Sequence, residues 1–131
     1  MITTISAKNL DEAQALLREI ATKLAPELTR AADISMRLLV AGLTVEPPPP
    51  AGSRYVRTGA QSSVWRAMQP GLTGIGGFGL INATEAARWT ESDDQAWMHV
   101  GRWQTARQVV AANLDAILAA YDAAVQQAAA R

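Results

Sequence analysis

The chain has 131 residues, room for one domain, and its 49% hydrophobic and 18% charged content excludes an intrinsically disordered protein. Twelve basic and twelve acidic residues give no net charge, which removes the simplest case for a nucleic-acid binder. There is no cysteine, so disulfides and thiolate chemistry are excluded. The N-terminus lacks the pattern of a signal peptide, and no apolar run reaches the roughly 20 residues that span a bilayer, so we expect a cytoplasmic protein.

Two composition biases bear on function. Ten of the twelve basic residues are Arg, which is favoured at protein interfaces, although a GC-rich genome would raise Arg and Ala together. Four Trp stand against one Phe, more than a core of this size needs. We therefore expect some of the tryptophans at contacts between subunits.

The first part of the chain, residues 1–46, is predicted to be helical. A weak alternation over 2–6 predicts a short edge strand, and Asn9 with Glu12 then forms a capping box. Apolar residues follow at helical spacing to about Ala41. Pro26 either kinks this helix or begins a second one.

The middle of the chain combines a proline-rich spacer, 47–54, with a β and loop part, 55–103. Four consecutive prolines favour polyproline II, either as a rigid spacer, which we prefer, or as a ligand of a proline-binding domain. Alternating residues at 64–68 and 78–81, around a Gln-Pro-Gly turn, predict a small antiparallel sheet near 55–83. A short helix is expected at 85–89.

The last part, 104–131, is predicted to be one long helix capped by Thr105. Its apolar residues recur at spacings of four and three: Val110, Leu114, Ile117, Tyr121 and Val125. Such a helix is nearly 40 Å long at 1.5 Å per residue, so part of it should pack on a neighbour or fray. The predicted fold is a single α+β domain with N-terminal helices, a small antiparallel β-sheet and a long C-terminal helix.

Motifs that carry chemistry are weak in this sequence. The stretch 74–79 matches G-x-G-x-x-G but lacks the buried strand before it and the helix after it. His99 is the single histidine, and Asp93 and Asp94 are adjacent rather than paired on one face. We therefore expect no enzyme, and no catalytic, cofactor-binding or metal site.

Charge is segregated along the chain. The stretch 47–84 has no acidic residue but carries arginines with aromatic residues between them: Arg54, Tyr55, Arg57, Trp65 and Arg66. This pattern suits either a small nucleic-acid face or a contact patch for an acidic neighbour, such as the 91–94 segment of another copy. Net neutrality favours the contact patch.

Two stretches resemble a known family. Pro47-Pro48-Pro49-Pro50-Ala51-Gly52-Ser53-Arg54-Tyr55-Val56-Arg57-Thr58-Gly59, followed by Val64-Trp65, resembles a segment of the HK97 tail-component (gene-product-ten-like) family of tailed bacteriophages. Ala87-Arg88-Trp89, Gln95-Ala96-Trp97-Met98-His99 and Gly101-Arg102-Trp103 are similar to a later part of such proteins. The chain departs from the family pattern at Gln61 and at Val64.

The resemblance implies an α+β virion subunit of the phage neck or upper tail, assembled in the host cytoplasm. Relatives join head to tail, complete the tail or terminate it, as rings around the DNA channel, so we expect a six- or twelve-fold homo-oligomer. Its partners would be other neck, connector or tail-tube proteins, with non-specific proximity to DNA and no membrane. The alternatives are a minor capsid or head-closure protein of the same virion, or a small phage nucleic-acid-binding protein.

The expected assembly contacts gather in the two resembling stretches: Arg54, Tyr55, Arg57, Thr58, Gly59, Trp65, Trp97, His99, Arg102 and Trp103. Within this set we expect Gly59 to take a backbone conformation that other residues resist, and Arg57 to bond a carboxylate or carbonyls. The aromatic residues near position 100 either form a contact loop or cover the base of the terminal helix within one subunit.

Overall fold

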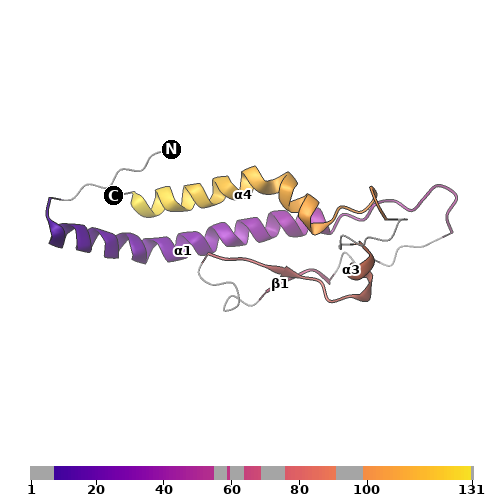
Figure 1. Cartoon of the computed structure of the whole chain (residues 1–131), viewed down its shortest axis with the longest axis horizontal. Coiled ribbons are helices and arrows are strands. Elements are labelled where there is room, and N and C mark those ends of the chain that lie inside the picture. Colours follow the sequence, from indigo (N-terminus) through magenta and orange to yellow (C-terminus); the bar gives the residue numbers. More distant parts are fainter. Residues whose placement is uncertain (1–7, 55–58, 60–63, 69–75, 91–98, 131) are drawn as a thin grey trace. The chain divides into compact units, whose positions relative to one another are not determined.

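A computed structural model of the chain describes residues 8–54, 59, 64–68, 76–90 and 99–130. Its elements, in chain order, are α1 (Leu10–Leu43), β1 (Arg66–Ala67), β2 (Leu80–Ile81), α3 (Glu85–Thr90) and α4 (Ala106–Ala129) (Figure 1). The chain divides into two compact units. The first comprises Met1–Ser35, Gln69–Phe78 and Asp115–Arg131, and the second Met36–Met68 and Gly79–Leu114.

Helix α1 begins where its capping residues predict. The side-chain oxygen of Asn9 accepts a 2.8 Å hydrogen bond from the main-chain N–H of Glu12, and the Glu12 carboxylate accepts one of 2.7 Å from the N–H of Lys8. The helix then runs for 34 residues with Pro26 inside it. The structure therefore has one continuous helix, and the alternative of a second helix beginning at Pro26 is wrong.

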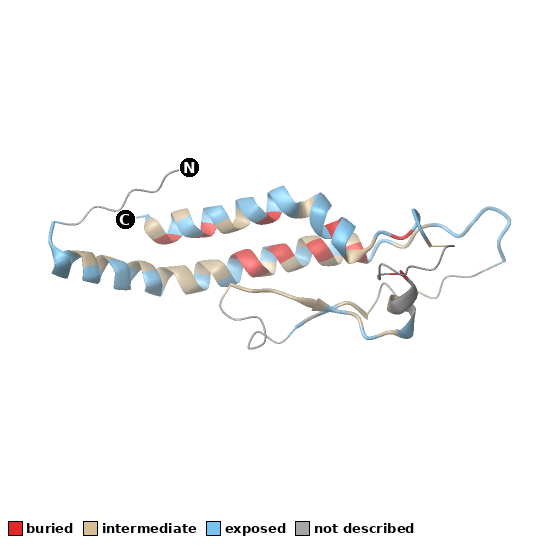
Figure 2. Cartoon of the chain, in the orientation of Figure 1, coloured by how far each residue is buried: buried red, intermediate tan, exposed pale blue. Residues whose placement is uncertain are grey.

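In the first unit, the residues buried on α1 and α4 are mostly small, and Figure 2 marks the buried positions of both helices in red. The buried residues are Ala31, Ala32 and Ser35 of α1 and Ile117, Ala124 and Ala128 of α4. Ser35 satisfies its buried hydroxyl by donating a 2.8 Å hydrogen bond to the carbonyl of Ala31. Small residues leave little side-chain bulk between two helix axes, so the backbones can approach closely.

A short segment at 76–78 is fixed to both helices of the first unit. The Tyr121 hydroxyl of α4 donates a hydrogen bond to the carbonyl of Gly76, and the Tyr121 ring stacks on Phe78 with centroids 6.5 Å apart. Gly76 has a φ of +73°, and a Cβ added there would lie 2.9 Å from the Cβ of Leu28 in α1. Both the backbone conformation and the close approach require glycine at this position.

In the second unit, α4 begins at the predicted cap. The main-chain N–H of Thr105 donates a 2.9 Å bond to the side chain of Gln108, whose own N–H donates a 3.3 Å bond to the Thr105 hydroxyl. In the same unit, the large apolar side chains of Leu39 and Leu43 in α1 and of Val109 in α4 are buried. The long C-terminal helix, to Ala129, is thus confirmed.

The predicted α+β fold with a small antiparallel sheet near 55–83 is wrong. The described part of this region forms one antiparallel pair of two-residue strands, with Arg66 opposite Ile81 and Ala67 opposite Leu80. Two residues per strand cannot build a sheet with a hydrophobic face, because a lone short hairpin is marginal without further strands. The chain is mostly helical, and α3 matches the short helix expected at 85–89.

The remaining sequence expectations for this region lie outside the described residues. They are the edge strand at 2–6 and the turn at 69–71.

Candidate functional site

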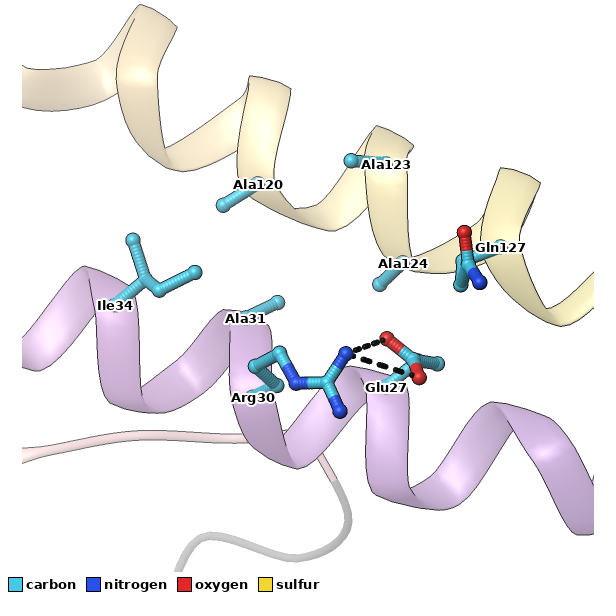
Figure 3. Close-up of a pocket in the computed structure, with 8 residues that line it drawn as sticks. All are labelled: Glu27, Arg30, Ala31, Ile34, Ala120, Ala123, Ala124 and Gln127. Atoms are coloured by element: carbon cyan, nitrogen blue, oxygen red, sulfur yellow. Dashed lines mark hydrogen bonds and ion pairs between the residues drawn. The ribbon is translucent and has the colours of Figure 1, made fainter.

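The first candidate site is a groove between α1 and α4 in the first unit (Figure 3). It has a volume of about 220 Å³, and both helices contribute to its lining: Glu27, Arg30, Ala31, Ile34, Ala120, Ala123, Ala124 and Gln127. The alanine methyl groups and the Ile34 side chain, itself 43% exposed, make its apolar part. A groove of this composition suits an aliphatic side chain rather than a polar ligand.

An ion pair lies at one side of this groove. Arg30 donates from Nη1 to both carboxylate oxygens of Glu27, at 2.9 and 3.2 Å. The Arg30 side chain is largely exposed, and the two residues are three positions apart on one helix. The ion pair therefore contributes only about 0.2–0.5 kcal/mol to stability. Its effect is to hold the Glu27 carboxylate in place beside the apolar lining.

A second surface lies on α4, within the first unit. Leu118 and Val125 are 58% and 45% exposed, and the exposed Asp115 and Asp122 lie three or four residues from Leu118. Residues at these spacings share one side of a helix. We call these four residues the α4 ridge; it is apolar along its line and acidic at its edge.

The length and composition of α4 would also let it cross a membrane. However, Asp115 and Asp122 would each cost about 2.5–3.5 kcal/mol near a bilayer centre. Between Gln108 and Ala130 there is no Lys or Arg to bind anionic lipid headgroups. The exposed apolar side chains of α4 are therefore better suited to a protein surface than to lipid.

A third surface belongs to the strand pair of the second unit. Arg66 and Ile81 are directly opposite each other in the pair, so their side chains stand on one face. Met68 lies two residues further on, and its N–H donates a 2.9 Å hydrogen bond to the carbonyl of Gly79. All three side chains are exposed, Ile81 by 50%. We call Arg66, Met68 and Ile81 the strand face.

Of the contacts expected around the Arg-Thr-Gly step, three residues are described. Arg54 is exposed, and Trp65 is half-buried, with no hydrogen-bond partner for its Nε1 atom within the described residues. Gly59 has a φ of +73°, which confirms the expected special backbone conformation. The others lie outside the described residues: Tyr55, Arg57, Thr58 and Trp97.

The remaining three expected contacts come together before α4. Trp103 is buried, at 6% exposure, and the His99 ring meets it edge-on with centroids 6.3 Å apart. Arg102 is exposed and donates a 2.9 Å hydrogen bond from Nη2 to the carbonyl of Pro48. Arg102 thus fixes the proline-rich spacer to the turn before α4, and the Trp103 ring is buried with His99 against its edge.

The α1–α4 groove has no signal in the sequence, because the alanines that line it form no distinctive pattern in an alanine-rich chain. In the parts of the chain that the structure describes, no three His, Asp or Glu residues gather closely enough to hold a metal ion. Comparison with known proteins finds no matching family model, no matching curated protein and no matching solved structure.

Proposed function

We propose that this protein is a structural subunit that works by assembling with other protein chains, in the neck or upper tail of a tailed-bacteriophage particle. The observation that carries the assembly role is the α4 ridge, where Leu118 and Val125 remain about half exposed. Large apolar side chains that line up on one side of a helix, with a polar edge, are typical of protein-contact surfaces.

The way α4 is packed strengthens this proposal. In the first unit, two of the three buried positions of α4 hold alanine, Ala124 and Ala128, whereas the larger Leu118 is exposed. A helix that served only its own core would bury its largest apolar side chains first, because they release the most surface from water. The arrangement on α4 leaves that surface available to a partner.

The place in a phage particle rests on the resemblance of residues 47–65 and 87–103 to the HK97 tail-component family. Within that proposal the protein forms a ring at the junction of head and tail, by head-to-tail contacts that close on themselves. A minor capsid or head-closure role in the same virion is the nearest alternative.

The test is a cryo-electron-microscopy reconstruction of particles induced from the bacterium that carries the gene, together with peptide mass spectrometry of the purified particles. We expect peptides of this chain at constant copy number and density for helices α1 and α4 in a ring near the neck. Particles that lack the protein, or that hold isolated copies without mutual contact, would contradict the proposal.

A further inference from the structure

We infer that the α4 ridge of one copy binds the strand face of a second copy, so that the chain associates head to tail. This inference deepens the proposed assembly function and rests on it, by naming the partner that covers the ridge. It arises from opposite charges and from exposed apolar side chains on two surfaces of the same chain.

The charges of the two surfaces are complementary. The ridge carries Asp115 and Asp122 in a segment of α4 that has no Lys or Arg. The strand face carries the exposed Arg66 in a stretch, 47–84, that has no Asp or Glu. Opposite charges at the edge of a contact select the partner and fix its register.

The apolar parts of the two surfaces also correspond. Leu118 and Val125 are seven residues apart, which is about 10 Å along a helix. Met68 lies two residues beyond the Arg66–Ile81 pair, which is about 7 Å along a strand. Ile81 is 50% and Met68 37% exposed, and Met is a side chain that adapts readily to an irregular surface.

Pairing of one ridge with another ridge is disfavoured by the same charges. Two α4 helices placed ridge to ridge would bring four carboxylates, Asp115 and Asp122 from each copy, to one interface with no cation from either segment. Like charges in such a position cost affinity. Contact between two different surfaces avoids this cost, and it also lets each copy bind two neighbours.

The chain has no cysteine, so single cysteines give a clean cross-linking test. Leu118→Cys and Ile81→Cys are made in separate full-length chains that differ in mass through a tag, then mixed and oxidised. We expect the mixed disulfide dimer to form in clear excess over either homodimer. Ala119→Cys, next to Leu118 and also exposed, is the matched control and should cross-link to Ile81→Cys only weakly.

Three outcomes would overturn the inference: no mixed dimer at any accessible concentration, a Leu118→Cys homodimer in excess, or a disulfide within one chain when both cysteines are in the same molecule. Circular dichroism checks that each variant folds. If either does not, Val125→Cys and Met68→Cys take their place in the same mixture.

Charge exchange gives a second readout, by sedimentation velocity at several salt concentrations. Asp122→Arg or Arg66→Asp alone should weaken association by about tenfold, and the two together should restore most of it. Arg18→Asp, on the exposed side of α1, should leave it unchanged. Failure of the double exchange to restore association would count against the contact.

These experiments separate the inference from the proposed function. If the protein lies in the neck ring but the mixed dimer does not form, only the choice of contact surfaces is wrong. If the mixed dimer forms but phage particles lack the protein, the contact stands and the proposed place of assembly is wrong.

Discussion

Gly42 of α1 and Val109 of α4 lie so close that a Cβ atom added to the glycine would stand 2.5 Å from Cγ1 of the valine. In an exposed helix, Gly→Ala raises the free energy of unfolding by about 1 kcal/mol. Here the new methyl group meets a side chain that is 1% exposed and stiff at χ1. We expect Gly42→Ala to lower the free energy of unfolding by about 1–3 kcal/mol, measured by urea denaturation.

The control for this prediction is a double-mutant cycle with Val109→Ala. Removing the valine methyl groups makes room for the new Cβ, so the double variant should be more stable than the sum of the two single effects predicts. Strict additivity would show that the two residues do not clash.

The Tyr121 hydroxyl supports the segment at 76–78 by donating to the carbonyl of Gly76. Tyr121→Phe keeps the ring contact with Phe78 and removes only this bond. We expect a loss of about 1 kcal/mol in the free energy of unfolding at neutral pH, measured by chemical denaturation. Phe78→Leu is the complementary variant, which keeps the hydroxyl bond and removes the ring contact.

The same residue predicts a pH dependence in the alkaline range. Burial raises the pKa of Tyr121 above its ordinary value of 10.0, because desolvation disfavours the phenolate. The unfolded chain therefore loses this proton at lower pH than the folded chain. The stabilisation is complete below pH 10 and is lost as pH rises through the folded-state pKa. Melting temperatures from pH 8 to 11 should fall less steeply in Tyr121→Phe than in the wild type.

Gly59 offers a test of backbone conformation without packing. Its φ is +73°, and among the residues that the structure describes no atom lies within 4 Å of an added Cβ. Gly59→Val should therefore cost about 1–2 kcal/mol through backbone strain alone. Gly59→Asn should cost much less, since Asn tolerates the left-handed region. Equal melting temperatures for the two variants would show that the strain argument is wrong.

Trp103 is the most buried aromatic residue among those described, at 6% exposure. Trp103→Ala should lower the free energy of unfolding of the free protein by about 3–5 kcal/mol, measured by chemical denaturation. His99→Gln should change it far less, because the His99 ring meets Trp103 edge-on and is itself only half-buried. An unchanged melting point for Trp103→Ala would mean that the side chain is not part of the core.

The first residues of α1 and α4 could be predicted from the sequence, because a helix start depends on local capping chemistry. Asn9 and Thr105 are capping residues followed three positions later by Glu12 and Gln108, and both helices begin immediately after their caps. The sequence leaves the effect of Pro26 open, since proline fits either the first turn of a new helix or the interior of a kinked one. The apolar stripe that continues on both sides of Pro26 favours one continuous helix. The strands are shorter than the alternation predicts, because alternation over five residues does not reveal whether further strands exist to extend the pairing.

The packed face of α4 could be predicted only in part from its large apolar residues: Ile117 of the predicted stripe is buried. Val110, Leu114 and Val125 belong to the predicted stripe, yet each is at least 40% exposed. Two of the four buried positions of α4 hold alanine, Ala124 and Ala128, and a search for the periodicity of large side chains does not detect them. Small side chains at the contact allow two helices to approach closely. In an alanine-rich helix such side chains occur on every side, so the sequence does not show which side packs.

Pro26 divides α1 into two halves that open to solvent differently. Its ring nitrogen carries no proton, so the carbonyl of Thr22 cannot receive the usual bond from four residues on. Before it, Leu10 and Leu17 are 71% and 59% exposed; after it come the buried positions from Ala31 onwards. We therefore expect amide hydrogens of residues 10–25 to exchange with deuterium much faster than those of 31–43. That result would show two cooperative units of local unfolding in a helix that is continuous in its geometry.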